Sequence, residues 1–496
     1  MEIFEIELDI GSAETPHRAR RLHQQLKAAI VGGELKPGTK LPSSRQSATL
    51  FGMARTTVVG VYDQLLGEGY LTARHGSGTY VADSPPSLPA ARAADTPVPE
   101  HRLNPFWFRH DVTSAFGFFD DRSAIVPAPE GERFDFRPGL VDLKNFPFDI
   151  WRRVSAQKER AFERAPFNYG DPQGDRDLRS AVSMHLSVMR GVACHADDLI
   201  ITSGAQQAFD LLARILVDPG RTRVAVEEPG YGPTRIPFAA AGATLYPVEV
   251  DAEGMIVGQL PADIDIICVS PSHQFPLGST LSKKRRAALI QFARDHGAII
   301  IEDDYDGEFR AKGGPIKALK SADEDDVVFY VGTFSKSTLP NIRLGFVLPP
   351  SWATQALVTA KICIDGPCSL PAQTAMTGFI AGGHLTRHIA RMRRLYGERR
   401  QLLLDLLRDD FADWLDPIES AYGMHVTALS NGAIDVDAVI ATLARRNVEI
   451  RSLRRYYLGA ASHAGLVFGL GSMDLPAMRR AMALVHDVMR EAPPAQ

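Results

Sequence analysis

One buried strand and its polar end constrain the chain most. Residues 327–331 (Val-Val-Phe-Tyr-Val) predict a strand that is covered on both faces, which Gly332 is expected to end. The residues that follow are polar: Thr333, Ser335, Lys336 and Arg343. A lysine at a buried strand end can form a Schiff base with an aldehyde, and hydroxyls with an arginine suit a phosphate. Both together indicate pyridoxal 5′-phosphate (PLP) on Lys336, unless Lys336 is an ordinary surface lysine.

A second apolar run, residues 298–301, leads into Glu302, Asp303, Asp304 and Tyr305. A carboxylate here can pair with the protonated pyridine nitrogen of PLP, and we expect Asp303 to do so. Tyr305 is then expected beside the phenolic oxygen of the ring. Asp304 should face the other way, because side chains alternate along a strand. The alternative is that these acids simply cap the strand.

Three more strands are expected to end in polar turns. Gly204, Ala205 and Gln206 start a helix whose free amides could cradle the phosphate, although most such turns bind nothing. Tyr231, after Glu228-Pro229-Gly230, could stack on the cofactor ring or pack within its own domain. Residues 270–278 are polar and follow an apolar run. Such convergent strand ends are where ligands bind in open α/β sheets.

In this order, the motifs Ser-Gly-Ala-Gln-Gln, Glu-Pro-Gly-Tyr, Pro-Ser-His-Gln-Phe-Pro, Asp-Asp-Tyr and Thr-Phe-Ser-Lys resemble fold-type I PLP proteins. The chain is more specifically similar to the aminotransferase-like domain of MocR/GabR transcription regulators. The resemblance implies a large, mostly parallel αβα sheet with a small C-terminal α/β lobe, over residues 133–490, the lobe starting at about 415. It also implies that Tyr169 touches the cofactor phosphate of a neighbouring subunit.

Two departures from the aminotransferase pattern bear on function. Phe275 stands where those enzymes place an asparagine beside the ring oxygen, so Tyr305 should carry more of that contact. Val467 matches the position of an arginine that clamps the substrate carboxylate. Its replacement could be Arg235, Arg451, Arg454 or Arg455. Without a bidentate clamp we expect poor amino-acid turnover, and the ligand could even lack a carboxylate.

The N-terminal part has a different pattern. Helical spacing over residues 17–31, 45–51 and 55–67, then extended pieces at 70–73 and 78–81, predicts a winged helix-turn-helix across residues 15–82. Between Thr15 and Val81 there are nine basic residues and three acidic ones, in a chain of net charge −4. This asymmetry favours a polyanion partner over a merely solvated basic face.

The motifs Leu-Pro-Ser-Ser-Arg, Arg-Thr-Thr-Val and His-Gly-Ser-Gly-Thr-Tyr-Val resemble GntR-type DNA-binding domains. The resemblance implies a double-stranded DNA operator as partner. The major groove and phosphates would meet Arg45, Arg55, Thr56 and Thr57, and the minor groove would meet His75 and Gly76. Val59 stands where some relatives carry another arginine, so we expect fewer contacts to DNA base edges.

Residues 83–132 read as a linker. Its first half is rich in Pro and Ala, whereas residues 104–108 and 116–119 are too aromatic for a solvated tether and are expected to dock on the large domain. The resemblance implies a homodimer in which the DNA-binding domains are swapped between subunits.

The remaining features fit a cytoplasmic protein. The four cysteines lack C-x-x-C spacing and read as reduced thiols, no signal peptide or membrane span is expected, and no metal site is predicted. The favoured hypothesis is a transcription regulator that holds PLP as a Schiff base and senses an amine or amino-acid effector. The alternatives are an active aminotransferase fused to a DNA-binding domain, and a regulator that senses PLP itself. Weak transaminase activity is compatible with the first hypothesis.

Overall fold

The computed structural model describes Leu8 and residues 17–74, 76–85, 103–115, 131–162, 169–310, 316–420 and 423–492. The chain divides into two compact units, residues 1–103 and 104–496. No helix within the described ranges is both long and apolar enough to cross a lipid bilayer. Residues 116–119, which were expected to dock, lie outside the described residues.

The N-terminal unit is a winged helix, as the sequence predicts. Its elements are α1 (Arg18–Val31), α2 (Ser44–Leu50), α3 (Arg55–Gly67), β1 (Leu71–Arg74) and β2 (Gly78–Val81). Helices α1 and α2 both pack on α3, and β1 pairs with β2 in antiparallel register. Leu22, Leu26, Val58 and Leu65 are fully buried between the helices, so the apolar stripe of each helix forms the core.

The C-terminal unit is built on an eight-stranded sheet among the described residues, in the order β4-β11-β10-β9-β8-β5-β6-β7. The strands are β4 (Ile200–Thr202), β5 (Arg223–Glu228), β6 (Thr244–Asp251), β7 (Gly254–Met255), β8 (Ile266–Val269), β9 (Ile299–Asp304), β10 (Val328–Thr333) and β11 (Gly345–Leu348). Strands β5, β6, β8, β9 and β10 run parallel, whereas β7 and β11 are antiparallel to their neighbours. This is the mostly parallel sheet expected of the fold.

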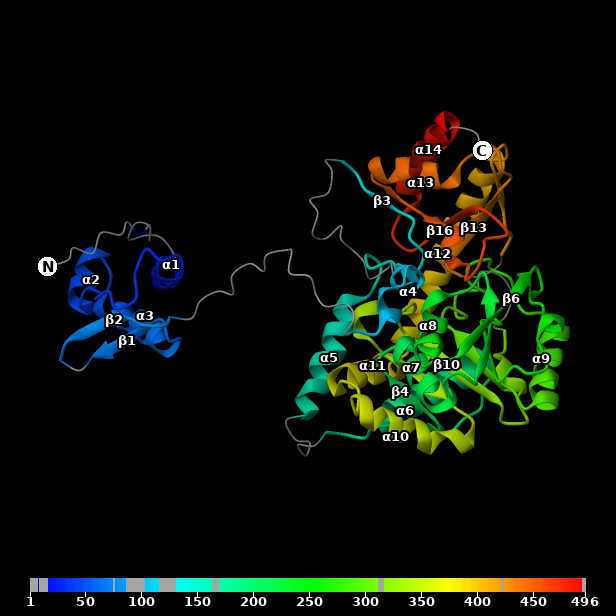
Figure 1. The fold of residues 1–496 in the computed structure, drawn as a ribbon, viewed down its shortest axis with the longest axis horizontal. Helices are drawn as coiled ribbons and strands as arrows, with labels where there is room; N and C mark the ends of the chain where they lie inside the picture. Colours follow the sequence, from blue (N-terminus) through cyan, green and yellow to red (C-terminus); the bar gives the residue numbers. More distant parts are fainter. Residues whose placement is uncertain are drawn as a thin grey trace. The chain divides into compact units, whose positions relative to one another are not determined.

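Helices cover both faces of this sheet (Figure 1). They are α5 (Phe148–Phe162), α6 (Arg176–Arg190), α7 (Ala205–Leu216), α8 (Gly232–Ala240), α9 (Lys283–His296), α10 (Thr354–Ile364) and α11 (Leu370–Ala381). Successive residues of one strand join different cores. Ile301 packs with α7, whereas Ile300 packs with α9 on the other side. The continuous apolar runs of the sequence follow from this burial on both faces.

A smaller lobe ends the chain. The 27-residue helix α12 (His384–Asp410) leads into an antiparallel sheet, β12-β13-β16-β15, covered by α13 and α14 (Figure 1). The bounds are β12 (Leu415–Pro417), β13 (His425–Ser430), α13 (Val436–Arg445), β14 (Val448–Glu449), β15 (Arg451–Ser452), β16 (Gly465–Gly469) and α14 (Leu475–Glu491). Strand β3 (Phe134–Asp135) pairs with β14, so this early segment of the C-terminal unit joins the small lobe.

One expectation about the central strand is wrong. Gly332 does not end β10, which continues through Thr333 and pairs with β11 there. A Cβ atom at residue 332 would lie 2.3 Å from the ring of Phe346. The glycine therefore makes room for an aromatic ring. A glycine inside a strand often marks such a close approach.

The described part of the linker's second half contains a 3₁₀ turn, η2 (Pro105–Phe108), and a short helix, α4 (His110–Ala115). Helix α4 contacts α8 and another 3₁₀ turn, η9 (Leu453–Tyr456), with Val112 buried. Trp107 and Phe108 stay more than half exposed. Helix α4 is thus attached both to a helix that covers the large sheet and to the small lobe.

Candidate cofactor and DNA sites

Five polar strand ends meet at one edge of the large sheet. Strands β5, β8, β9 and β10 are neighbours and parallel, and β4 runs the same way because β11 is antiparallel to both β4 and β10. Their carboxyl ends therefore lie along one edge. This brings together the predicted residues Gly204, Tyr231, Asp303, Tyr305 and Lys336 with their neighbours in sequence.

Lys336 faces a desolvated polar environment. Its amine donates a hydrogen bond to the carbonyl oxygen of Gly139 at 2.9 Å. Burial lowers the pKa of Lys336 to about 8, although the carboxylates of Asp306 and Asp303 oppose the shift. An amine with such a pKa is partly neutral near pH 7, which makes it a competent nucleophile toward an aldehyde.

Asp303 lines a pocket at the ends of β5, β8 and β9. Its walls are Val226, Glu227, Gly230, Tyr231, Thr234, Arg235, Cys268, Val269 and Ser270. Burial, followed by the charge of Asp304, raises the pKa of Asp303 to about 7, and the hydroxyl of Thr234 lies 3.4 Å from its carboxylate. A buried carboxylate of this kind is stabilised by a cation, such as a protonated ring nitrogen. The ring of Tyr231 meets Phe275 edge to face at 5.6 Å.

A cradle for an anion lies beside this pocket. Helix α7 begins at Ala205, so its free amides point toward the cradle. Gly204 has a φ of 82°, and a Cβ atom there would lie 2.9 Å from the guanidinium of Arg343. Thr333 and Ser335 add hydroxyls that are 3.1 Å apart. Gly204 therefore lies beside Arg343, and Ala205 and Gln206 are the first two residues of α7.

These residues fit PLP. The donors at Gly204, Arg343 and the start of α7 suit a phosphate dianion, Asp303 suits a ring nitrogen, and Lys336 supplies the amine. When bound, PLP supplies an electron sink for the bonds of an attached amine. Holding the ring, the phosphate and the proton on the nitrogen would be the task of the chain's own residues.

Sequence reasoning missed several groups in the site. Glu227 is buried in the pocket, and burial raises its pKa to about 8. His273 and Asp306 are buried next to Tyr305, with the Tyr305 hydroxyl 2.9 Å from Nδ1 of His273. All three residues lie within a few positions of residues that the sequence analysis discussed, so proximity in sequence was the only available signal. The Gly139 carbonyl lies 197 residues from its lysine and gave no signal of this contact.

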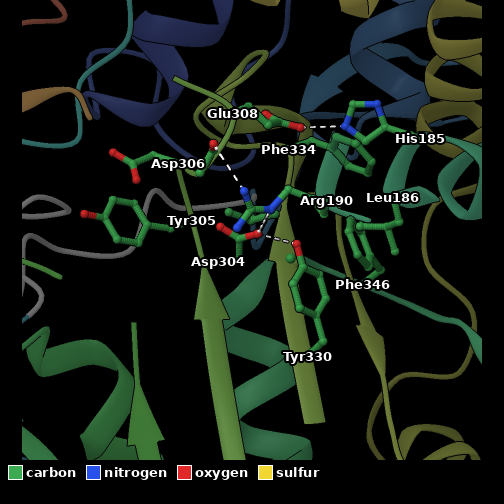
Figure 2. A pocket seen from close by; sticks show the side chains of 13 residues that line it. His185, Leu186, Arg190, Asp304, Tyr305, Asp306, Glu308, Tyr330, Phe334 and Phe346 are labelled. Carbon is green, nitrogen blue, oxygen red and sulfur yellow. Dashed lines mark hydrogen bonds and ion pairs between the residues drawn. The ribbon is translucent and has the colours of Figure 1, made fainter. Parts of the chain in front are cut away.

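Asp304 faces away from the cofactor pocket, as alternation along β9 predicts. It accepts a hydrogen bond from Nε of Arg190 at 2.5 Å and another from the hydroxyl of Tyr330 (Figure 2). Arg190 also donates to the carbonyl oxygen of Ile316 at 2.7 Å and to the hydroxyl of Ser272 at 2.5 Å. This buried network supports the strand end that carries Asp303 and Tyr305.

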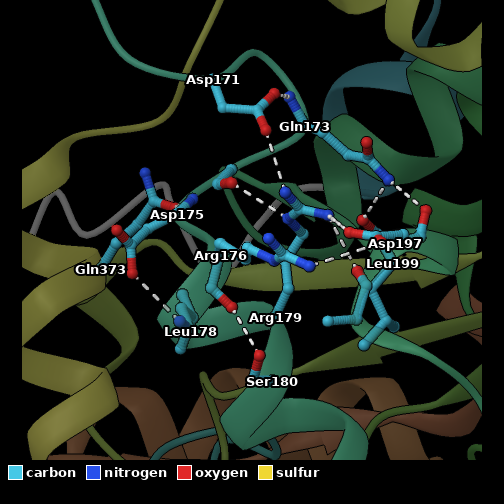
Figure 3. A network of polar contacts seen from close by, with 12 residues as sticks. Asp171, Gln173, Asp175, Arg176, Leu178, Arg179, Ser180, Asp197, Leu199 and Gln373 are labelled. Carbon is cyan, nitrogen blue, oxygen red and sulfur yellow. Dashed lines mark hydrogen bonds and ion pairs between the residues drawn. The ribbon is translucent and has the colours of Figure 1, made fainter.

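Tyr169, which was expected to touch the cofactor phosphate of a neighbouring subunit, is 95% exposed. Hydrogen bonds hold the turn that follows Tyr169, residues 171–174, in place. Arg179 donates to Asp171 at 2.9 Å and to the carbonyl oxygen of Gly174 at 3.0 Å, and Gln173 donates to that of Leu199 at 3.0 Å (Figure 3). Tyr169 is therefore presented to solvent by an ordered turn.

The four arginines considered as carboxylate clamps have different surroundings. Arg451 donates to Glu449 at 3.2 Å, and Arg454 lies 3.7 Å from Asp437. Arg235 is buried and donates to the backbone carbonyl oxygens of Tyr456 and Tyr457, both at 3.3 Å. Burial lowers the pKa of Arg455. Of the four, Arg235 lines the Asp303 pocket.

The predicted DNA contacts lie mostly on the surface of the winged helix. Arg45, Arg55 and Thr56 are exposed and Thr57 is half-buried, at the start of α2 and α3. Nε of Arg55 donates to the hydroxyl of Ser44 at 3.3 Å. Gly76 has a φ of 73° in the wing turn, and His75 lies outside the described residues. Two other basic side chains make contacts within the winged helix. Arg18 donates to the carbonyl oxygens of Phe51 and Gly52, and Lys27 pairs with Glu68.

Comparison with known families matches both units. The model of bacterial regulatory proteins of the gntR family matches residues 18–81, and that of aminotransferase class I and II matches residues 143–458. The probable rhizopine catabolism regulatory protein MocR of Rhizobium meliloti is 34% identical over 93% of this chain and 91% of its own length. The pyridoxine biosynthesis transcriptional regulator PdxR of Corynebacterium glutamicum is 33% identical over 97% and 99%.

Solved structures match the C-terminal unit. An archaeal alanine:glyoxylate aminotransferase superposes with a TM-score of 0.71 at 21% identity, over 79% of this chain and 98% of that one. The kynurenine aminotransferase of Pyrococcus horikoshii, solved with PMP, gives a TM-score of 0.68 at 24% identity, over 75% and 97%. At these identities the similarity establishes the fold, which is the fold-type I architecture that the motifs predict.

Proposed function

The chain belongs to the gntR-family regulators that carry a class I/II aminotransferase-like domain, and we propose that it senses an amine or amino-acid effector through PLP held as a Schiff base by Lys336. That it is a DNA-binding transcription regulator with PLP as cofactor follows from its relatives and its fold. The observation that supports the sensing role is Lys336, whose lowered pKa and position beside Asp303 suit exchange of the bound amine.

An effector can act only if it binds two states of the protein unequally. Helix α8 lines the Asp303 pocket with Thr234 and Arg235, and Arg235 donates hydrogen bonds to carbonyl oxygens of the small lobe. An amine that replaces Lys336 on the cofactor would change the contacts at this junction. We infer that the resulting shift between lobe positions alters operator affinity.

The proposal includes a homodimer with swapped DNA-binding domains that works in the cytoplasm, where operator DNA is found. Tyr169 supports it, because an exposed tyrosine on an ordered turn suits contact with a partner's phosphate site. Several apolar residues of the C-terminal unit are also exposed: Leu143, Phe148, Met184, Val188, Ile362 and Leu370. Burying them would favour association. A monomeric mass at micromolar concentration would contradict this part.

Catalytic transamination is the second candidate, favoured by the complete set of Lys336, Asp303 and Tyr305. Val467 speaks against it, because this buried residue of β16 packs with Leu453 and Tyr457 and offers no charge to a carboxylate. Sensing of PLP itself is the third candidate, and the relative named as a regulator of pyridoxine biosynthesis supports it.

The test is operator affinity measured with defined ligands. A DNA site selected from random oligonucleotides is titrated with protein in PLP alone, and then with a panel of amines and amino acids. We expect one class of amine to change the affinity by about 5- to 150-fold, with no response in Lys336→Ala. A change caused by PLP alone would establish the third candidate, and turnover of about 1 per second or more would establish the second.

We expect Arg55→Ala to weaken operator binding by about 10- to 100-fold, which corresponds to roughly 1–3 kcal/mol for one base or phosphate contact. Arg55 is exposed at the start of α3, where a recognition helix meets the groove. Binding should be measured at several stated salt concentrations, because the phosphate part depends on salt. Arg21→Ala is the matched control, since it removes the same charge from the exposed face of α1. Equal effects of both variants would reject the recognition-helix role of Arg55.

A further inference from the structure

Tyr305 is in contact with a buried histidine–aspartate pair. Its hydroxyl oxygen lies 2.9 Å from Nδ1 of His273, and both carboxylate oxygens of Asp306 lie 3.0 Å from the same nitrogen. His273 and Asp306 are each 2% exposed. We propose that His273, oriented by Asp306, is a positioning residue that fixes the direction in which Tyr305 donates its proton. This inference rests on the proposed function, because the phenolic oxygen of PLP is the acceptor.

The direction follows from the hydrogen on the imidazole. A bare lone pair on Nδ1 would face the lone pairs of both Asp306 oxygens, so Nδ1 carries the hydrogen and donates it. The Tyr305 oxygen shares this N–H as an acceptor, and its own hydrogen is then directed elsewhere. Burial, followed by the charge of Asp306, raises the pKa of Tyr305 well above its usual value. The hydroxyl therefore stays protonated and acts as a donor toward the cofactor.

The imidazole ring has little room to move. A Cβ atom at Gly423 would lie 1.8 Å from Cε1 of His273, and one at Gly278 would lie 3.5 Å from its Nε2. Both glycines have a φ near +80°, which other residues rarely adopt. The ring of His425 lies 4.8 Å away on the small lobe. Close backbone approach from both lobes therefore locks the orientation that the Asp306 contact selects.

Phe275, a neighbour of Tyr305, makes the direction of the Tyr305 hydroxyl important. Phe275 meets Tyr305 edge to face at 6.3 Å and also meets Tyr456 at 4.8 Å. An aromatic ring at this position offers no N–H to a phenolic oxygen, whereas an asparagine would. Tyr305 thus has to supply the hydrogen bond that the related enzymes share between two residues. The constraint on its hydroxyl compensates for the missing donor.

A cation site is the other chemistry that these residues suggest. Ligand atoms of His273, Asp306 and His425 lie within 4.8 Å of one another. However, His425 directs Nε2 to the carbonyl oxygen of Pro276 at 3.0 Å, and the Nδ1–H of His273 already occupies Asp306. The buried guanidinium of Arg400 adds positive charge beside His425. These features favour a histidine that orients a hydroxyl over one that binds a cation.

The test follows the Schiff-base absorbance of the PLP-loaded protein as a function of pH. The midpoint is the pH at which half of the Schiff-base imine is protonated. A hydrogen bond from Tyr305 to the phenolic oxygen favours the form with an unprotonated imine. Removing the His273 donor, which directs Tyr305, should therefore raise this midpoint by about one pH unit. Other charges around the site act on the same midpoint. They are Asp303, Asp304, Asp306 and Glu227 near Tyr305, Arg343 near Lys336, and His425 and Arg400 near His273. The design must therefore separate a proton directed by Tyr305 from a general change in charge.

His273→Gln places its amide nitrogen near the Nε2 position, away from Tyr305, and should show the full rise of the midpoint. His273→Asn places its amide nitrogen near Nδ1 and should keep most of the wild-type midpoint. In the Tyr305→Phe background, His273→Gln should add nothing. His185→Asn is the matched control, because its amide lies near the Nδ1 position whereas His185 contacts its partner through Nε2. It breaks another buried His–carboxylate pair, with Glu308 at 2.6 Å, on the far side of the Arg190–Asp304 pair from Tyr305 (Figure 2).

An unchanged midpoint in His273→Gln would overturn the proposal. So would an equal rise with and without the Tyr305 hydroxyl, because that result indicates a through-space charge effect. If His273→Gln does not fold, His273→Leu carries the same test, since it also removes the N–H beside Tyr305 and leaves the Asp306 carboxylate in place, and a rise of the midpoint is again expected. Loss of the absorbance band in the wild type would contradict the proposed function instead, which keeps the two failures apart.

Discussion

Replacing Lys336 by alanine is expected to abolish the visible Schiff-base absorbance completely. The amine of Lys336 interacts electrostatically with Asp303 and with Arg343 of the anion cradle, and no covalent bond to PLP can form without this amine. The absorbance spectrum of purified protein with added PLP measures the result. Borohydride reduction of the wild type should leave the pyridoxyl group on the peptide that contains residue 336.

The rate of band formation should depend on pH in a defined way. Only the neutral amine attacks an aldehyde, and the pKa of Lys336 is lowered to about 8. The rate should therefore rise with pH and level off above about 8, whereas an ordinary lysine would continue to gain reactivity up to about 10.4.

Lys361→Met is the matched control for the alanine variant. This lysine is also buried, yet it donates to Asp365 at 3.0 Å and to Gln207 at 3.3 Å. The control protein should keep the band. A band that persists in Lys336→Ala, or that disappears only in the Lys361 variant, would show that the covalent site has been assigned to the wrong lysine.

Arg190→Met is expected to destabilise the C-terminal unit by about 3–5 kcal/mol, because it leaves the Asp304 carboxylate buried without its cation. Burial opposes the charge of Arg190, yet Asp304 beside it keeps the pKa of the guanidinium raised. For a unit of this size, the loss corresponds to a fall of roughly 4–6 °C in the thermal midpoint. Calorimetry of the PLP-loaded protein measures the change.

The double variant Arg190→Met/Asp304→Asn should recover part of this loss, since neither charge remains buried. Arg214→Ala serves as the surface control. Its pair with Asp210 at 2.8 Å is about half exposed, and such pairs contribute about 0–1 kcal/mol. A wild-type midpoint in Arg190→Met would reject the supporting role of the network. A double variant no more stable than the single one would show that lost packing, and not the unpaired charge, is responsible.

The sequence predicted the strand ends well because burial on both faces leaves continuous apolar runs, as in β9 and β10. Once the connections are strand–helix–strand, the carboxyl ends must share an edge. That argument brought Lys336, Asp303 and Gly204 together without knowledge of any contact. Alternation along β9 likewise separated Asp303 from Asp304.

Other features depended on packing that a local pattern does not encode. A glycine in a strand can end it or admit a neighbouring ring, and only the contact of Gly332 with Phe346 decides between these roles. The His273–Asp306 pair joins residues from two different strand ends, 33 positions apart. Whether a histidine is buried next to a carboxylate depends on loop geometry, so the quoted motif contained His273 without revealing its role.

Helix α4 contacts both α8 and η9, and so it has one neighbour on each lobe. A six-residue helix cannot keep both attachments unchanged if the lobes rotate against each other. It is also the first described α-helix after the winged helix, so a rotation of the lobes around the vitamin B6 ring would displace the point where the chain leading from the DNA-binding domain attaches to the C-terminal unit.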